Sequence, residues 1–311
     1  MEKISLVVSA FNEEQGIEDF HKEADRILSD YVKTEEGSGY TYDFWFVNDG
    51  SRDSTGELLK KLRNENPETV KIIEFSRNFG HEAAMCAGLD HADGDYLIFM
   101  DADLQHPPML VPEIMRKFRE GAEVISMVRT ENEDAGKWKN IASGMFYSLI
   151  NKMSTMHMEP SASDFFALSK EPADVLRNSF REKIRFIRGY VQNIGFNKAT
   201  VSYEAARRVA GESHYSFKKL FKLSMDTIVC FSDMPLKFGF VAGVITGVAA
   251  LIVLIVTLIG GSLKGTAAVI TVMLFLFAVL FMLIGITGRY LSAMLAEIKD
   301  RPIYIIKDIE K

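Results

Sequence analysis

The fold is decided by the stretch Tyr96-Leu97-Ile98-Phe99-Met100-Asp101-Ala102-Asp103-Leu104-Gln105-His106-Pro107-Pro108. Its first five residues are an apolar run typical of a buried strand, and the turn sequence Asp93-Gly94-Asp95 precedes it. Asp101 and Asp103 follow at the carboxyl end of the expected strand, where open α/β sheets bind ligands. Their oxygens suit a divalent cation, and a cation that bridges phosphates suits a nucleotide diphosphate substrate. Without such a strand before it, an Asp-x-Asp is more often a solvated turn.

The first 130 residues alternate between strand and helix patterns. We expect strands over residues 4–9, 44–47, 70–75, 96–100 and 123–128, and helices over 13–31, 54–64, 81–91 and 112–120. This alternation predicts a mainly parallel sheet covered by helices on both faces. Polar side chains follow each expected strand, so we expect the ligand site at the carboxyl ends of the strands.

The chain becomes strongly apolar after residue 237. Residues 238–263 and 265–288 contain no charged side chain, and Lys264 alone separates the two runs. A membrane-spanning helix needs about 20 apolar residues, and both runs exceed the length expected of buried core helices. The sequence therefore predicts a transmembrane hairpin of two helices, at about 238–260 and 266–288.

Flanking charges orient this hairpin. Four cationic side chains precede it and four follow it, namely Lys218, Lys219, Lys222, Lys237, Arg289, Lys299, Arg301 and Lys307. The positive-inside rule then places both termini in the cytoplasm. Because Met1-Glu2-Lys3-Ile4 leads straight into an expected strand, we expect no secretory signal peptide. We expect a multi-pass protein of the cell membrane with four parts: a cytoplasmic catalytic domain over 1–215, a juxtamembrane segment over 216–236, the hairpin over 237–288, and a cytoplasmic tail over 289–311. The juxtamembrane segment fits an amphipathic helix on the membrane surface or a surface helix of the soluble domain.

Composition excludes other classes of protein. The net charge of −6 argues against nucleic-acid binding, which normally uses a basic face. Cys86 and Cys230 lie far apart in the sequence, so we expect two free thiols in a reducing compartment.

Three motifs resemble the hallmarks of family 2 glycosyltransferases. They are Val7-Val8-Ser9-Ala10-Phe11-Asn12-Glu13-Glu14, Val47-Asn48-Asp49-Gly50-Ser51-Arg52-Asp53-Ser54-Thr55 and Asp101-Ala102-Asp103-Leu104-Gln105. Residues 76–84, residues 297–304 and the two apolar helices are similar to the polyprenyl-phosphate glycosyltransferases, which include bactoprenol glucosyltransferases and dolichyl-phosphate mannose synthases. The resemblance implies a Rossmann-like GT-A domain and an inverting transfer from a nucleotide-sugar to a lipid phosphate.

The same resemblance assigns roles to individual residues. It implies that Asp103 and Gln105 ligate Mg2+ or Mn2+, and that Asp101, Asp103 and Arg129 are catalytic. The nucleotide-sugar would contact Ala10, Phe11, Glu13, Asp49, Ser51, His81, Asp101 and Ala102. The acceptor phosphate would contact Arg129, Arg208, Ser213 and Asp164. Asp49 would accept a hydrogen bond from the uracil N–H, although an Asp before Gly also commonly forms a turn.

The acceptor phosphate needs no general base. The second pKa of a phosphate monoester is near 6, so the acceptor is already an anionic nucleophile at neutral pH. It needs a cationic cradle instead, and the Arg129 guanidinium can bind phosphate in a fork. Within residues 203–215, Arg208 and Ser213 match the family pattern, whereas Ala205 and His214 replace two of its usual cations.

Two further side chains allow alternative interpretations. Asp164 falls where relatives have a strand that faces the acceptor, but it could equally be a structural cap. His106 could be a metal ligand, although an outward-pointing or hydrogen-bonded supporting position is the stronger expectation.

The sequence thus predicts a hexosyltransferase that loads undecaprenyl phosphate from a UDP-sugar, with UDP-glucose as the leading donor. UDP-N-acetylglucosamine, UDP-galactose and GDP-mannose are alternative donors, and a non-catalytic membrane scaffold is the alternative function. A processive synthase is disfavoured because neither Trp45 nor Trp138 follows a Gln-x-x-Arg-Trp pattern. A flippase is disfavoured because two helices cannot line a path without extensive assembly. Membrane lipid is an expected partner, and relatives suggest a homo-oligomer formed through the membrane helices.

Overall fold

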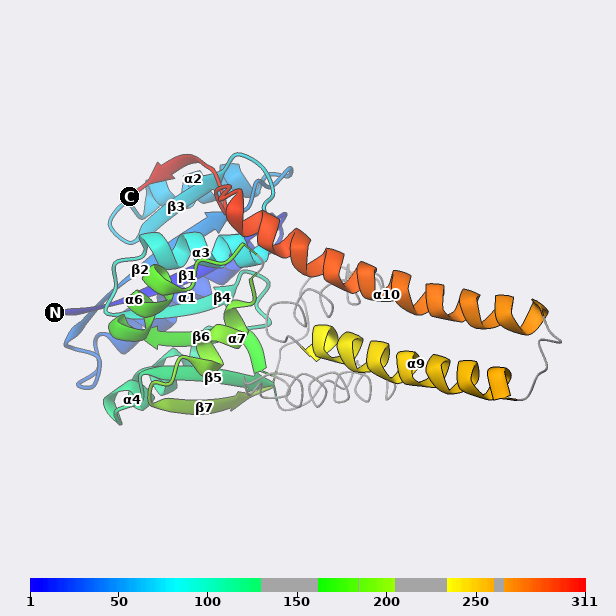
Figure 1. The fold of residues 1–311 in the computed structure, drawn as a ribbon. Helices are drawn as coiled ribbons and strands as arrows, with labels where there is room; N and C mark the ends of the chain where they lie inside the picture. Colours follow the sequence, from blue (N-terminus) through cyan, green and yellow to red (C-terminus); the bar gives the residue numbers. More distant parts are fainter. Residues whose placement is uncertain (130–161, 184, 205–233, 260–265) are drawn as a thin grey trace. The chain divides into compact units, whose positions relative to one another are not determined.

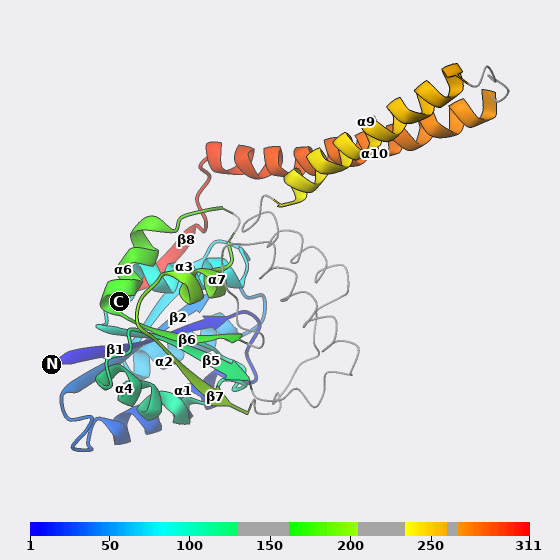
Figure 2. The same ribbon diagram turned by 60° about the horizontal axis from the view of Figure 1, so that its bottom comes forward.

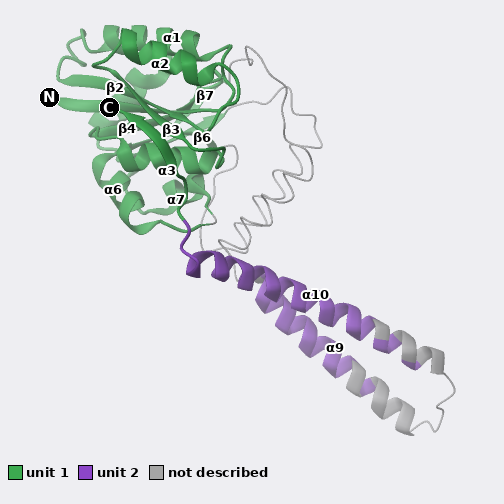
Figure 3. Cartoon of the chain, turned by 90° about the horizontal axis from the view of Figure 1, so that it is seen from above, with its two compact units in different colours: residues 1–147, 157–217, 302–311 green, residues 148–156, 218–301 purple. Residues whose placement is uncertain are grey.

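The structure, a computed structural model, describes residues 1–129, 162–183, 185–204, 234–259 and 266–311. The chain divides into two compact units (Figure 3). One comprises residues 1–147, 157–217 and 302–311, and the other comprises residues 148–156 and 218–301. The first unit therefore combines the amino-terminal part of the chain with its last ten residues.

Within the described residues, eight strands form one sheet in the order β7-β5-β6-β4-β1-β2-β3-β8 (Figure 1). The strands are β1 (Glu2–Ala10), β2 (Tyr40–Asn48), β3 (Val70–Phe75), β4 (Tyr96–Asp101), β5 (Val124–Arg129), β6 (Ala162–Ser169), β7 (Lys198–Tyr203) and β8 (Ile306–Glu310). β1 pairs in parallel with β2 and β4, β2 with β3, and β5 with β7. β6 and β8 pair antiparallel to their neighbours. The predicted, mainly parallel sheet is confirmed.

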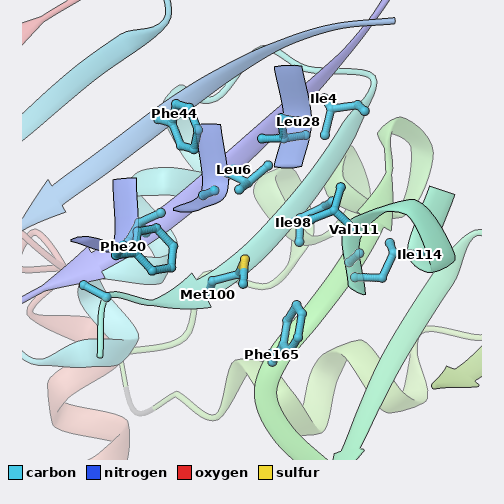
Figure 4. Close-up of a cluster of buried hydrophobic side chains, with 14 of the residues drawn as sticks. Ile4, Leu6, Phe20, Leu28, Phe44, Ile98, Met100, Val111, Ile114 and Phe165 are labelled. Carbon is cyan, nitrogen blue, oxygen red and sulfur yellow. The ribbon is translucent and has the colours of Figure 1, made fainter. Parts of the chain in front are cut away.

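Helices cover both faces of this sheet (Figure 2). α1 (Ile17–Tyr31), α2 (Thr55–Glu65), the short η1 (Pro108–Leu110) and α4 (Val111–Arg119) lie on one face. α3 (His81–His91), α6 (Lys170–Ser179) and α7 (Ile187–Asn193) lie on the other. The first face carries the main apolar core, a cluster that includes Leu6 of β1, Ile98 of β4 and Phe20 of α1 (Figure 4). This core fixes the strands whose ends form the site described below.

The alternation of side chains along β1 explains why both faces are covered. Leu6 and Val8 belong to the main core, whereas Val7 points to α3. Gly88 of α3 lies so close to β1 that a Cβ there would come within 2.0 Å of Val7 Cγ1. The missing side chain at Gly88 therefore permits the close packing of α3 on the sheet.

The predicted strands and helices of the first 130 residues are all present, with small shifts at their ends. The largest shifts are of four residues: β2 begins at Tyr40 instead of the expected residue 44, and α1 begins at Ile17 instead of the expected residue 13. Residues 13–16 form a turn instead, in which the N–H groups of Gly16 and Ile17 donate to the Glu13 carbonyl at 3.1 and 3.0 Å.

The carboxyl-terminal segment differs from the expected tail over 289–311. α10 (Thr266–Ile298) continues ten residues beyond the predicted end of the second apolar helix at residue 288. The segment after it returns to the sheet, where β8 pairs antiparallel with β3. Tyr304 anchors this return, because its ring stacks on Phe75 at 5.2 Å and its hydroxyl donates to Asp90 at 2.6 Å. This strand was not predicted from the sequence, because a short strand can gain its stability from the edge to which it adds.

The second unit contains α9 (Met234–Ile259) and α10. Among the residues that the structure describes, only residues 275–298 are long and apolar enough to cross a membrane, and residues 235–249 form a shorter apolar helix. One of the two predicted spans thus has a counterpart, and the complete hairpin stays a prediction. Nearly all of the predicted juxtamembrane segment, residues 216–233, lies outside the described residues.

Substituting Gly88 by alanine should destabilise the sheet unit, because α3 or Val7 would have to move to admit the new methyl group. We expect a loss of about 1–3 kcal/mol, which thermal unfolding of the detergent-solubilised protein would show as a lower Tm. Gly39→Ala is the matched control, since a Cβ at Gly39 meets no atom within 4 Å. Equal melting of both variants would contradict the close approach of α3 to β1.

Candidate active site

The carboxyl ends of β1, β2 and β4 bring the predicted site residues to one edge of the sheet. The parallel register places Ser9 beside Asp101 and Ala10 beside Asn48, which precedes Asp49. Ala10 and Ala102 are buried in the main core. Phe11, by contrast, is 41% exposed just beyond the end of β1.

Asp49 is almost completely buried at the end of β2 and organises the loop after β3. Its carboxylate accepts hydrogen bonds from the Phe79 and Gly80 N–H groups at 2.6 and 2.9 Å and from Asn78 Nδ2 at 2.8 Å. Burial raises the pKa of Asp49, although the two backbone N–H groups act in the opposite direction. A carboxylate has about four lone-pair sites, so these three bonds leave acceptor capacity for a ligand.

The next residue, Gly50, allows this loop to approach. Its φ is +65°, and a Cβ there would lie 2.4 Å from the carbonyl carbon of Arg77. Such a turn requires glycine both for its backbone conformation and for the space.

The loop after β1 is tied to the start of α2. Ser51 Oγ accepts the Asn12 N–H at 3.0 Å, and Thr55 Oγ1 accepts the Glu13 N–H at 2.8 Å. Asn12 adopts a left-handed conformation with φ of 57°, which asparagine tolerates better than most residues. Ser51 was predicted to contact the nucleotide-sugar, and in the structure it fixes the loop that carries Phe11 and Glu13.

Asp101 and His81 are linked through a serine. Ser9 Oγ donates to Asp101 Oδ1 at 2.8 Å and lies 3.0 Å from Nδ1 of His81. Because the Asp101 carboxylate can only accept, it takes the single hydroxyl hydrogen of Ser9, and the Ser9 oxygen is left to accept from His81, which assigns a proton to Nδ1. Burial lowers the pKa of His81, but the nearby carboxylates of Asp101 and Asp164 raise it above its ordinary value.

The segment that follows β4 presents the predicted metal ligands. Asp103 Oδ1 accepts the Gln105 N–H at 3.1 Å, and Leu104 between them adopts a left-handed conformation with φ of 59°. This conformation is uncommon for leucine and marks a tight turn at the site. Arg129, at the end of β5, donates to Gln105 Oε1 at 3.4 Å.

His106 holds the start of this segment through a hydrogen bond to its backbone. It is buried, its Nδ1 accepts the Asp101 N–H at 3.0 Å, and its ring stacks on Phe165 at 5.1 Å. Burial lowers its pKa. The expected hydrogen-bonded supporting role of His106 is confirmed.

Asp164 lies on β6 between two basic side chains. Arg188 Nη1, from α7, is 3.7 Å from Asp164 Oδ1, and His81 Nε2 is 3.9 Å from Asp164 Oδ2. Sequence reasoning missed Arg188, because α7 has seven residues and such a short helix carries no periodic pattern. Arg208 and Ser213 lie outside the described residues.

The residues after β4 fit a divalent cation that is shared with a substrate. Among the described residues, no three His, Cys, Asp or Glu side chains form a cluster that could hold a metal. Mg2+ commonly binds through one or two carboxylates and takes its other ligands from substrate phosphates and water. Asp103 and Gln105 offer hard oxygen ligands of this kind.

Comparison with known proteins identifies relatives along nearly the whole chain. Residues 5–176 match glycosyl transferase family 2. An uncharacterized glycosyltransferase of Bacillus subtilis is 36% identical, over 97% of this chain and 93% of that protein. The prophage bactoprenol glucosyl transferase homolog of Escherichia coli K12 is 33% identical, over 99% of this chain and 100% of that protein. An SfII prophage-derived bactoprenol glucosyl transferase of Shigella flexneri is 34% identical, over 98% and 97%.

Among solved structures, glucosyl-3-phosphoglycerate synthase from Mycobacterium tuberculosis is 20% identical with a TM-score of 0.45, over 73% of this chain and 78% of that chain. The family match covers more than half of this chain, and the sheet has the expected GT-A-like α/β arrangement. The protein is a glycosyltransferase, and the chain belongs to glycosyl transferase family 2.

Proposed function

We propose that this enzyme transfers a hexose from a UDP-sugar to undecaprenyl phosphate, with inversion at the anomeric carbon and with UDP-glucose as the leading donor. The observation that carries the proposal is that Asp49, Asp101 and Asp103 lie at one edge of the sheet. The chain also matches bactoprenol glucosyl transferases nearly end to end. UDP-N-acetylglucosamine, UDP-galactose and GDP-mannose remain alternative donors. A scaffold without activity would have no need for this set of carboxylates.

The proposed reaction forms a bond between a phosphate oxygen and the anomeric carbon of the sugar, while the bond from that carbon to the nucleoside diphosphate breaks. The acceptor oxygen is already anionic, so no residue has to remove a proton. Asp103 and Gln105 would hold Mg2+ or Mn2+, which would neutralise charge on the departing diphosphate. The protein then has to bind and orient two anionic substrates.

Arg129 is the residue that we propose for the acceptor phosphate, together with Arg208 and Ser213. It ends β5 and contacts Gln105, so it lies beside the proposed metal ligands. A guanidinium carries a permanent charge and donates through a planar fork, which suits a phosphate.

We also propose that α9 and α10 form a two-helix hairpin that crosses the cell membrane, with the catalytic unit in the cytoplasm. β1–β7 and β8 belong to one sheet, so the chain between β7 and β8 must cross the membrane an even number of times. Exposed aromatic side chains on both helices, among them Phe240 and Phe281, favour two crossings over none.

Asp103→Asn should abolish transfer while leaving the fold intact, because the amide cannot supply the charge that a divalent cation requires. The measurement is formation of labelled glycolipid from undecaprenyl phosphate, Mn2+ and a panel of UDP- and GDP-sugars in membranes. Asp19→Asn, on α1, is a matched control at an exposed position. Full activity of Asp103→Asn would refute the metal site, and no product from any donor with the parent enzyme would favour the scaffold.

Arg129→Ala should raise the KM for the lipid phosphate by at least about tenfold and change that for the nucleotide-sugar far less. Loss of one charge-assisted phosphate contact is worth about 1.5–3 kcal/mol. Steady-state kinetics with each substrate varied in turn checks this. Equal effects on both KM values would show that the acceptor site has been placed wrongly.

The proposed hairpin can be tested by labelling single cysteines. In a variant with Cys86 and Cys230 replaced by alanine, a cysteine at Ser262 should react with a membrane-impermeant maleimide in intact cells or spheroplasts. A cysteine at Lys311 should react only after lysis, because β8 stays with the cytoplasmic sheet. Protection of both positions in intact cells would contradict the two crossings.

A further inference from the structure

Three side chains beside the proposed metal ligands form a set that the reaction above does not use. They are Asp164 of β6, Arg188 of α7 and His81 of α3, and they are 34%, 20% and 36% exposed. Each comes from a different element, and the guanidinium and the imidazole approach the same carboxylate through different oxygens. The set is therefore assembled by tertiary packing and is partly open to a ligand.

We propose that Asp164, Arg188 and His81 form the subsite that binds the hydroxyl groups of the donor hexose. The inference rests on the proposed function, since it names the residues that would recognise the sugar of that donor. It also moves Asp164 from the acceptor-phosphate set, where the sequence placed it, to the sugar.

The chemistry of these groups suits neighbouring sugar hydroxyls. A hydroxyl both donates and accepts a hydrogen bond, a carboxylate only accepts, and a guanidinium only donates. The contacts of Asp164 with Arg188 and His81, at 3.7 and 3.9 Å, are longer than hydrogen bonds. They hold the carboxylate in place by charge and still allow hydroxyls to bind to it.

His81 provides a second observation that points to a ligand. Its Nδ1 is engaged by Ser9, so Nε2 faces Asp164, and this buried nitrogen has no hydrogen-bond partner in the structure. A hydroxyl oxygen can lie about 2.8 Å from each of two atoms that are 3.9 Å apart. In the protonated ring, one sugar hydroxyl could therefore accept the Nε2 N–H and donate to Asp164.

The position of the set favours the sugar over the acceptor phosphate. Ser9 links His81 to Asp101, and the proposed metal ligand Asp103 follows two residues later. A sugar bound here would lie next to the diphosphate that carries it. A phosphate would meet three carboxylates, those of Asp101, Asp164 and Glu82, around the His81 imidazole, and this concentration of like charge would repel it.

Glu82 acts as a positioning residue for the same subsite. Its carboxylate accepts the Ile187 N–H at 2.9 Å, and this hydrogen bond links α3 to α7. Ile187 begins α7 and directly precedes Arg188. The hydrogen bond thus fixes the helix end from which the guanidinium reaches Asp164.

The test compares the binding of a nucleotide with that of its sugar conjugate. Isothermal titration of the full-length, detergent-solubilised protein with Mn2+ gives Kd values for UDP, GDP, UDP-glucose, UDP-galactose, UDP-N-acetylglucosamine and GDP-mannose. For Arg188→Gln we expect an unchanged Kd for the nucleotide alone, within about twofold, and a Kd for the preferred nucleotide-sugar that rises about tenfold or more. The Kd of Arg188→Lys for the nucleotide-sugar should lie between that of Arg188→Gln and that of the parent, because lysine keeps the charge but lacks the forked donors of the guanidinium.

Two further variants separate positioning from general damage. Glu82→Gln keeps an oxygen that can accept the Ile187 N–H, so it should bind the nucleotide-sugar nearly as the parent does. Glu82→Ala should weaken the nucleotide-sugar selectively. Arg116→Gln, at an exposed position on α4, is the control for loss of an arginine and should change neither Kd.

Several outcomes would overturn the subsite. Equal weakening of nucleotide and nucleotide-sugar by Arg188→Gln would assign Arg188 to the diphosphate, and a rise only in the KM for undecaprenyl phosphate would assign it to the acceptor. A parent enzyme that binds no nucleotide-sugar more tightly than its nucleotide would also contradict it. If Arg188→Gln does not fold, the Kd values of Arg188→Lys and Glu82→Ala replace it as the test. Weakening of the nucleotide-sugar alone would uphold the subsite, and equal weakening of the nucleotide would overturn it. Selective sugar binding without transfer to undecaprenyl phosphate would uphold the subsite and refute only the proposed acceptor.

Discussion

The parallel pairing of β1 with β2 and β4 is the constraint on which the site depends. It sets Ser9 beside Asp101, and it brings the end of β1 beside the residue before Asp49. Side chains alternate along β1, so Ser9 faces α3 and His81 while Ala10 faces the main core. A slip of one residue would exchange these faces. The core of Leu6, Val8 and Phe20 thereby also determines which groups reach the ligand.

This register gathers negative charge at one edge, and specific donors stabilise each carboxylate. Asp49 is held by two backbone N–H groups, Asp101 by the Ser9 hydroxyl, and Glu82 by the N–H at the start of α7. A buried charge without such partners costs several kcal/mol. The backbone N–H groups that stabilise Asp49 and Glu82 belong to the loop after β3 and to the start of α7. The same hydrogen bonds therefore stabilise the two carboxylates and fix the shape of the site around them.

Local patterns were sufficient to predict the strands and helices of the first 130 residues, because apolar runs and turn sequences are properties of neighbouring residues. They also placed Asp49, Asp101 and Asp103 at strand ends. The insertion of β6 between β4 and β5 has no local cause, nor does the addition of β8 to β3. Arg188 reaches Asp164 only because α7 packs near β6. Contacts of this kind depend on tertiary packing and leave no pattern in a single sequence.

With phosphate as the proposed nucleophile, the imidazoles of the site have no proton to move. In the structure, Nδ1 of His106 accepts a backbone N–H and Nδ1 of His81 is tied to Ser9. The harder task is to bring an anionic acceptor to an anionic donor at an edge already lined with carboxylates. In the proposed reaction, cations would come from elsewhere in the fold, with Arg129 of β5 toward the acceptor and Arg188 of α7 toward the donor sugar. Both belong to segments that follow the first strands in the chain. On this proposal, the two arginines distinguish the sides of the acidic edge: Arg129 marks the acceptor side and Arg188 marks the sugar side.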